Sequence, residues 1–349
     1  MKRLLFSATL IAAGLFVGLG ISEAMVRLFA PHSRDHVIPA GMFAIDSALG
    51  WRLNPGAVAR HRTRYFDVEY RINPLGFRDH PRVAAGEDSV LRVLVFGDSQ
   101  VFGWGVNVDQ RFSSVLDVRM PGVEAWNMAV PGYGFDQQVL SYEKSGDEIP
   151  AAAVVFYASS ATLSRMKFGF IFGKPKPKFV LDSSGALALV PLERRSAALT
   201  DGVYRLLSRF YLPYFLEAQL IRLVARDGRV TAVVERNSGE DAAGLSLLEA
   251  ILLRARAGAS QRGHRLIILA SLSEETITRL QAFCDTNGMT LVSTGWPSAP
   301  ANLVFGKHDR HWIPEAHAQV ASKLMEAVSS IHASNRFSNA VPSDPPGGS

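Results

Sequence analysis

The chain has 349 residues, of which 48% are hydrophobic and 20% are charged, and its formal net charge is +5. This composition supports a folded core and excludes a disordered or collagen-like chain. Lysine and arginine never run beyond a pair, so we predict no nucleic-acid partner. The single cysteine, Cys284, excludes an intramolecular disulfide and a cysteine-rich metal site. We expect it to pack inside the protein, and we predict no cofactor.

Residues 1–30 carry a membrane-targeting pattern. After Lys2 and Arg3, positions 4–21 are apolar apart from one serine and one threonine, and at about 1.5 Å per residue such a helix nearly crosses the ~30 Å hydrocarbon core. The leading positive charges predict a cytoplasmic N-terminus. We therefore predict a single-pass signal anchor in a bacterial inner membrane, with the remainder in the periplasm. Small residues at 22–24 leave open a cleaved signal peptide and a secreted protein.

Residues 31–88 are predicted to be a small β-rich segment. Positions 46–80 are rich in arginine, proline, glycine and aromatic residues. Within them, residues 66–72 alternate apolar with polar side chains, which predicts a strand before a turn at 73–76.

Residues 89–335 are predicted to form the main domain. Apolar runs of strand length are found at 91–96, 123–128, 152–157, 265–270 and 289–292. Helical patterns at 240–262 and 274–288 flank the fourth of these runs, and another follows from about Pro314 to Ile331. Strands separated by helices predict a parallel sheet covered on both faces, that is, a flavodoxin-like α/β fold with three α/β/α layers.

An insertion at about 166–240 interrupts this domain. A hairpin is predicted at 179–190, and the apolar spacing over 203–226, with Pro213 inside it, predicts one or two helices. These helices either cover the sheet or close over a site as a lid. Residues 336–349 end in a run of proline, glycine and serine and are predicted to be a disordered tail.

A serine follows the first strand of the predicted sheet. Gly97-Asp98-Ser99 places a hydroxyl at the carboxyl edge, where open α/β sheets bind ligands. Serine is a nucleophile only beside a base, and Asp309 and His311 supply a carboxylate and an imidazole two residues apart. In an extended loop both side chains point the same way, so the carboxylate can orient the ring. We predict that Ser99, His311 and Asp309 are catalytic and that Asp98 hydrogen-bonds its own loop.

Two further histidines lie close to this pair in the sequence. The spacing of His308, His311 and His317 matches neither the i, i+4 pattern of zinc enzymes nor a zinc finger. We expect His308 and His317 to be surface histidines, and we predict no metal site.

The order serine, aspartate, histidine resembles that of the SGNH, or GDSL-type, hydrolase superfamily. Residues 96–99 match its Gly-Asp-Ser block, and residues 127–132 look like its Asn-to-Gly block. Residues 309–312 have the Asp-x-His-Trp form of membrane-anchored members and of proteins that acetylate alginate. Residues 71–79 are similar to the element that precedes the catalytic domain in anchored bacterial members. The resemblance covers about 46–165 and 245–330.

The resemblance implies an oxyanion hole made by the backbone N–H groups of Ser99 and Gly132 and by an asparagine side chain after strand three. This chain has Phe-Tyr-Ala-Ser-Ser at 156–160, so Ser159 is the nearest substitute for the asparagine. A hydroxyl is shorter and rotates more freely than an amide. Loss of one such donor typically costs ~10²–10³ in rate.

The resemblance and the anchor together predict a membrane-anchored, extracytoplasmic serine esterase. Its substrates would be acyl esters, acetyl esters of a surface polysaccharide first among them, and its partners the membrane and the envelope polysaccharide machinery. Two alternatives stay open. An O-acyltransferase of polysaccharide biosynthesis would use the same triad, and a scaffold or binding protein of an envelope assembly would keep the fold without efficient chemistry.

Overall fold

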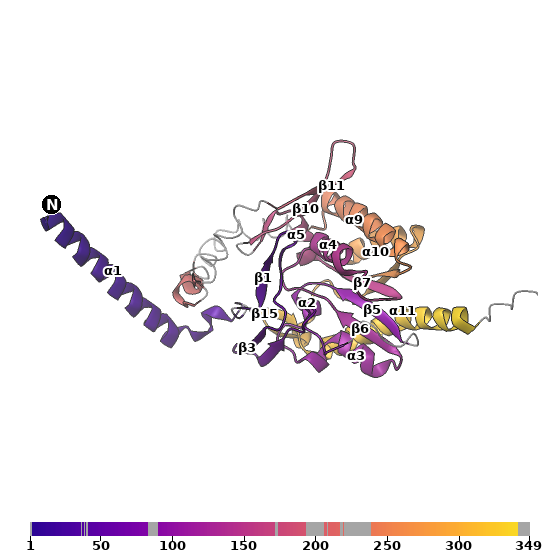
Figure 1. Ribbon diagram of the computed structural model, residues 1–349, viewed down its shortest axis with the longest axis horizontal. Helices are drawn as coiled ribbons and strands as arrows, with labels where there is room; N and C mark the ends of the chain where they lie inside the picture. Colours follow the sequence, from indigo (N-terminus) through magenta and orange to yellow (C-terminus); the bar gives the residue numbers. More distant parts are fainter. Residues whose placement is uncertain are drawn as a thin grey trace, which may run out of the picture.

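The structure, a computed structural model, places most of the chain. The residues that it describes are 2–35, 37, 39, 41–82, 90–171, 174–192, 206–207, 209–216, 219 and 239–340. Among them, the helix α1 (Lys2–Phe29) projects away from an α/β body, and the short helix η1 (Pro31–Arg34) leads from it into that body (Figure 1).

The body is built on one five-stranded sheet in which every pairing is parallel. Its order is β13-β12-β7-β5-β6, the flavodoxin-like doubly wound order. All residues of β5 and β7 are buried, as expected for parallel strands covered on both faces. The predicted three-layer fold class is confirmed, and the five apolar runs became its strands. These strands are β5 (Leu91–Phe96), β6 (Val123–Asn127), β7 (Ala153–Ser159), β12 (Arg265–Ser271) and β13 (Thr290–Ser293).

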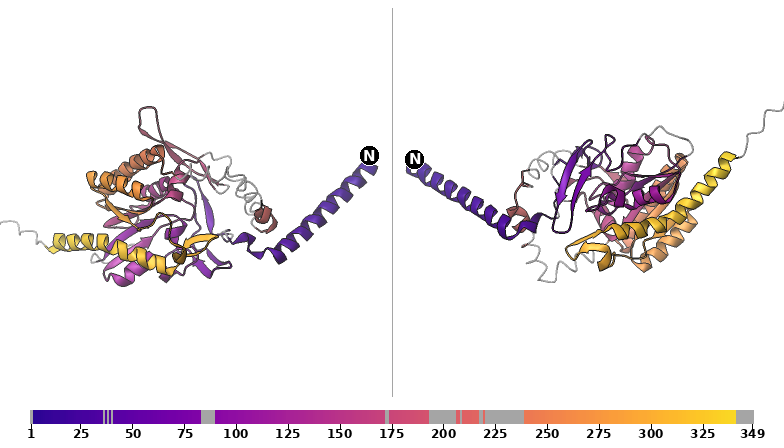
Figure 2. Two further views of the ribbon diagram at one scale, coloured as in Figure 1. Left: turned by 180° about the vertical axis from the view of Figure 1, so that it is seen from behind. Right: turned by 90° about the horizontal axis from the view of Figure 1, so that it is seen from below.

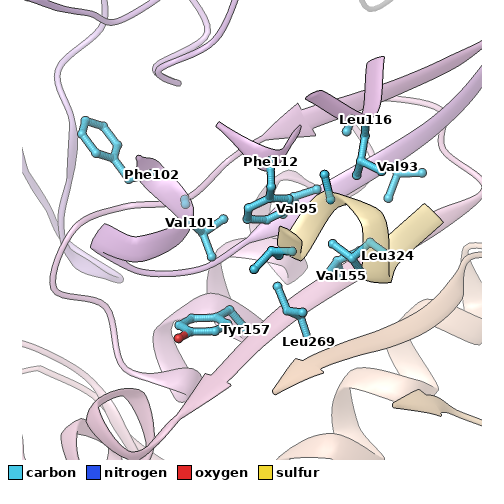
Figure 3. Close-up of a cluster of buried hydrophobic side chains, with 14 of the residues drawn as sticks. Val93, Val95, Val101, Phe102, Phe112, Leu116, Val155, Tyr157, Leu269 and Leu324 are labelled. Carbon is cyan, nitrogen blue, oxygen red and sulfur yellow. The ribbon is translucent and has the colours of Figure 1, made fainter. Parts of the chain in front are cut away.

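Helices cover the two faces of the sheet unequally (Figures 1 and 2). One face carries α3 (Phe112–Arg119) and α11 (Pro314–Ala340), whose apolar side chains meet those of β5, β7 and β12, as Figure 3 shows. The other face carries α4 (Phe135–Ser145), α9 (Ala242–Gln261) and α10 (Glu274–Thr286). Both faces of the sheet are therefore covered by helices, so a site can form only at the ends of the strands.

The predicted β-rich segment forms two antiparallel hairpins, β1 (Phe43–Asp46) with β2 (Gly50–Leu53) and β3 (Val58–Arg62) with β4 (Asp67–Arg71). They bind the loops at the carboxyl edge of the sheet. The Trp51 indole donates to the carbonyl of Pro131 (3.1 Å), and the Tyr133 hydroxyl donates to the carbonyl of Trp51 (2.6 Å). The Tyr70 hydroxyl accepts from the N–H of Gly105 at 2.9 Å. The segment thus braces the loops that follow β5 and β6.

The described part of the insertion holds two short pairings, β8 (Phe170–Ile171) with β9 (Lys174–Pro175) and β10 (Lys178–Leu181) with β11 (Leu187–Val190). The second is the hairpin predicted from the sequence. Of the predicted helical stretch at 203–226, residues 206–207, 209–216 and 219 are described. They lie beside the C-terminal end of α1 and not over the sheet (Figure 1).

Both ends of the chain bear on the sequence predictions. Among the described residues, Thr9–Phe29 is one span of 21 residues whose length and mean hydropathy of 1.8 suit a membrane crossing, and only 6% of it is buried. A signal anchor and a signal peptide share these properties. At the other end, α11 continues to Ala340, so positions 336–340, expected to belong to a disordered tail, are helical. The helix is longer because no proline or glycine follows Pro314 until after Ala340. The rest of the predicted tail lies outside the described residues.

Candidate active site

The nucleophile candidate lies at the carboxyl end of β5, beside β7. There the chain passes close to itself, since a Cβ added to Gly97 would stand 2.2 Å from Val101 Cγ2. Asp98 caps the short helix α2 (Ser99–Phe102) by accepting from the N–H of Gln100 at 2.9 Å. Ser99 therefore occupies the first helical position, at the point where the strand order of such sheets reverses.

The imidazole candidate comes from a hairpin of β14 (Val304–Gly306) and β15 (Asp309–Trp312). The Nε2 atom of His311 lies 2.8 Å from Ser99 Oγ, and its Nδ1 atom lies 2.7 Å from Asp309 Oδ1. The same Asp309 oxygen accepts from the backbone N–H of His311 at 3.0 Å. The structure thus brings these three residues into one hydrogen-bonded chain, although Ser99 and His311 lie 212 positions apart in the sequence.

The electrostatics of this chain favour an ionised carboxylate. Burial by itself would raise the pKa of Asp309, but the hydrogen bonds and charge of His311 outweigh burial and lower that pKa. The indole N–H of Trp104 contributes to the same lowering, although it lies outside good hydrogen-bond geometry. Asp309 is therefore a permanent acceptor for the Nδ1 proton at neutral pH, which leaves Nε2 free to accept a proton from Ser99.

Two residues that the sequence did not single out hold the imidazole in place. The Gln100 side chain makes two hydrogen bonds with the backbone of β15. Its amide N–H donates to the carbonyl of Arg310 (3.1 Å), and its amide oxygen accepts from the N–H of Trp312 (3.0 Å). The ring of Trp104 stacks on that of His311, with centroids 5.0 Å apart and planes 21° apart. The position of Gln100 directly after Ser99 was a usable signal, whereas no local spacing relates Trp104 to His311.

The glycine loop after β6 is tied to the nucleophile turn. Gly132 has a φ of 86°, a left-handed conformation that favours glycine. The Asn127 amide donates to the carbonyl of Val101 at 2.7 Å, and the N–H of Val130 donates to the carbonyl of Gly97 at 3.1 Å. The loop that carries the predicted Gly132 donor is thereby fixed against the segment that carries Ser99.

Ser159 is the last residue of β7 and caps α5 (Ser160–Met166). Its hydroxyl oxygen accepts from the N–H of Thr162 at 3.3 Å and lies 3.4 Å from the Thr162 hydroxyl. The side chain is almost completely buried. These contacts give Ser159 a structural use as a helix cap, and its predicted oxyanion role stays a prediction.

Arg165, on α5, links the two loops of the site and was also missed from the sequence. Its Nη1 donates to Asp98 Oδ2 at 2.8 Å and to the carbonyl of Tyr133 at 3.1 Å. The carbonyl of Arg165 accepts in turn from Lys176 Nζ at 3.2 Å, and that ammonium forms a fully buried ion pair with Asp136 at 2.6 Å. The Arg165 side chain therefore joins the residue before Ser99 to the residue after Gly132. Its own backbone is held in place by the bond from Lys176.

The other singled-out side chains fall outside this chain of contacts. His308 is exposed and Cys284 is buried, both as predicted. The prediction for His317 was wrong, because it is completely buried on the face of α11 that packs against α3 and accepts from the N–H of Phe112 at 3.3 Å. Burial lowers the pKa of His317 to about 3. Among the described residues, no group of three or more histidine, cysteine or acidic side chains could hold a metal ion.

Comparisons with known proteins give neighbours in structure alone. No protein-family model matches the sequence, and no curated protein matches it either. A lipolytic protein of the G-D-S-L family from Veillonella parvula is similar over 69% of this chain and 99% of its own, with 11% identity and a TM-score of 0.41. The esterase EstA from Pseudoalteromonas is similar over 68% and 97%, with 7% identity and a TM-score of 0.39.

A putative acylhydrolase from Bacteroides fragilis is similar over 70% of this chain and 90% of its own, with 11% identity and a TM-score of 0.38. Scores at this level do not assign a function to the chain. The contacts around Ser99 therefore carry the functional argument.

Proposed function

We propose that this chain is a serine hydrolase of the SGNH type that cleaves acyl esters. One observation carries the proposal: the imidazole of His311 lies between Ser99 Oγ at 2.8 Å and Asp309 Oδ1 at 2.7 Å, at the carboxyl edge of the sheet. Nucleophile, base and orienting carboxylate are then all within the reach that acyl transfer requires.

The mechanism follows from these contacts. His311 Nε2 takes the Ser99 proton as Oγ attacks the ester carbonyl, and the resulting imidazolium is stabilised by Asp309. The imidazolium then protonates the leaving alcohol, which departs and leaves an acyl group on Oγ. A water molecule, deprotonated by His311, attacks that acyl group, releases the carboxylic acid and restores the serine hydroxyl. A sugar hydroxyl in place of water would make the same site an O-acyltransferase.

The negative charge on the carbonyl oxygen requires donors. We assign this role to the N–H groups of Ser99 and Gly132, with the Ser159 hydroxyl as a third donor when it turns away from Thr162. The ion pair of Arg165 with Asp98, and its bond to the Tyr133 carbonyl, support the assignment by fixing both loops. Fixed donors stabilise the charge more than mobile ones, so Arg165 is a positioning residue for the oxyanion hole.

The proposal also includes a cellular location and a substrate class. α1 would anchor the chain in a bacterial inner membrane with the body in the periplasm, acting on acetyl esters of a surface polysaccharide. The apolar character of Thr9–Phe29 and the resemblance of the segments around 71–79 and 309–312 to membrane-anchored members support it.

One observation favours a second candidate function. The Ser159 hydroxyl caps α5, so the side-chain donor expected after β7 is engaged elsewhere, as in a scaffold that has lost efficient chemistry.

Labelling by a fluorophosphonate separates the two functions. For the full chain in detergent we expect one label per chain, on Ser99, and none on Ser99→Ala. His308→Ala, which changes an exposed histidine three residues from His311, should label at the wild-type rate. Folded wild-type protein that takes up no label would establish the scaffold.

A further inference from the structure

The C-terminal end of α1 is bound by residues 209–212 of the insertion. The Glu23 carboxylate accepts from the backbone N–H groups of Tyr211 and Leu212, each at 2.9 Å. Arg27 donates to the carbonyl of Arg209 at 3.1 Å, and its guanidinium lies 5.0 Å from the centroid of the Tyr211 ring. An ion pair of 2.7 Å joins Glu23 to Arg27. The described part of the insertion thus provides a specific binding site for the last turns of α1.

Large apolar side chains are exposed on both partners of this contact. Leu206 and Leu216 are each 56% exposed, and Leu207 and Phe210 are 43% and 41% exposed. At the end of α1, Met25, Leu28 and Phe29 are 51%, 71% and 72% exposed. We call these seven residues the collar.

The depth of the collar follows from the length of α1. The helix has 28 residues, so at ~1.5 Å per residue it is longer than the ~30 Å hydrocarbon core of a bilayer. When positions 4–21 fill that core, the turns bearing Glu23 and Arg27 reach the headgroup layer. Glu23 balances the charge of Arg27 in their ion pair, so the exposed Arg209 supplies the net positive charge of this layer, which suits anionic headgroups.

We propose that the collar binds the surface of an anionic phospholipid bilayer. Its leucine, methionine and phenylalanine side chains enter the boundary between headgroups and acyl chains, and Arg209, beside the collar, faces the lipid phosphates. An apolar face flanked by arginine is the usual composition of segments that lie in this boundary. The four collar residues outside α1 therefore give the protein a second membrane contact beside that helix.

The segment that follows α1 places the candidate site on the same side of the protein as the collar. Asp35, a few residues beyond α1, forms an ion pair of 2.9 Å with Arg64 on the turn between β3 and β4. On the same hairpin, the His61 ring packs edge-on against Trp104 at 4.7 Å, and Trp104 stacks on His311. The β14–β15 hairpin accordingly lies on the side of the body that faces α1 (Figure 2). If the proposed esterase function holds, the site works next to the bilayer, on esters presented there.

Depth-dependent fluorescence quenching tests the collar without any turnover. The full chain carrying Leu207→Cys is labelled with a nitrobenzoxadiazole maleimide and reconstituted into vesicles of phosphatidylcholine and phosphatidylglycerol. Lipids with a nitroxide near the headgroup supply the quencher. Cys284 is completely buried and does not compete for the label. The matched control is Leu189→Cys, at 45% exposure on the β10–β11 hairpin, far from α1 (Figure 1).

We expect quenching at position 207 to exceed that at position 189 several-fold, and the excess to fall when phosphatidylglycerol is omitted. Equal quenching at both positions would overturn the proposal. In unlabelled Leu207→Cys protein treated with a mild oxidant, a disulfide between two chains at position 207, together with no lipid quenching of the labelled protein, would also overturn it and would assign the surface to a second copy. The readout is the same on a Ser99→Ala background, so failure of the collar and failure of the esterase function are distinguishable.

Discussion

The two halves of the candidate site are built differently. On the histidine half, His311 and Asp309 come from one short motif on β15, and the two side-chain bonds from Ser99 through His311 to Asp309 are 2.8 and 2.7 Å long. On the oxyanion half, Ser159 at the end of β7 stands where an asparagine is expected, and it caps a helix. There the order comes from Arg165, which reaches both loops from α5. The comparison shows that the nucleophile and its base can come from short local motifs, while the alignment of the proposed oxyanion donors depends on the long-range contacts of Arg165.

The largest expected effect tests the histidine half. Ser99→Ala and His311→Ala should each lower kcat for a small acetyl ester by about 10⁴-fold or more, because nucleophile and base act as a unit. For the same reason the double variant should be little worse than either single one. His308→Ala is the control. Losses that add independently would contradict the proposed chain of proton transfer.

The second prediction tests the oxyanion half. Arg165→Met should lower kcat by about 10–100-fold with little change in KM, since misplaced donors weaken transition-state stabilisation and not substrate binding. Arg165→Lys should recover part of the loss because it keeps a charge beside Asp98. Arg254→Met, which breaks an ion pair with Glu143 on the helical face, is the matched control. An equal loss in Arg165→Met and Arg254→Met would reduce Arg165 to a general structural role.

The sequence predicted the sheet and the juxtaposition of Ser99, His311 and Asp309 because both depend on local signals, whereas their catalytic role stays a prediction. Buried parallel strands appear as uninterrupted apolar runs, and the carboxyl end of each strand is fixed by the topology. Gln100, Trp104 and Arg165 were missed because their partners lie on elements far apart in the chain. The seat of Glu23 on Tyr211 was missed for the same reason, since it joins residues 188 positions apart.

His317 is a different kind of error, because a local signal existed. Val320, Ala321, Leu324 and Val328 follow it at helical spacing and are all buried, so His317 lies on the apolar stripe of α11. Weighing its polar side chain above its position led to the wrong prediction of a surface histidine.

The third prediction concerns the buried His317, which lies in the first turns of α11, the helix that follows β15. Because burial lowers its pKa to about 3, the folded state keeps His317 neutral while the unfolded state binds a proton below about pH 6.5. Stability should therefore fall as pH drops from 6.5 towards 3, by about 1.4 kcal/mol per pH unit from this residue. His317→Phe removes that slope. Urea unfolding of the full chain in detergent should show a difference of about 2 kcal/mol in pH sensitivity between pH 6.5 and 5. Identical pH slopes would show that His317 is not held neutral.

The smallest expected effect decides whether Ser159 belongs to the site. Serine and asparagine cap helices about equally well, so Ser159→Asn should leave α5 intact. If position 159 faces the oxyanion, the longer amide supplies a fixed donor, and kcat should be preserved or rise a few-fold. Ser159→Ala removes both the cap and the hydroxyl, so it should cost about 1 kcal/mol of stability and lower kcat further. Fluorophosphonate labelling of Ser99 should persist in both variants, because nucleophile and base are unchanged. A kcat that is the same in the asparagine and alanine variants, with stability alone differing, would make Ser159 a helix cap only and leave the backbone N–H groups of Ser99 and Gly132 as the donors.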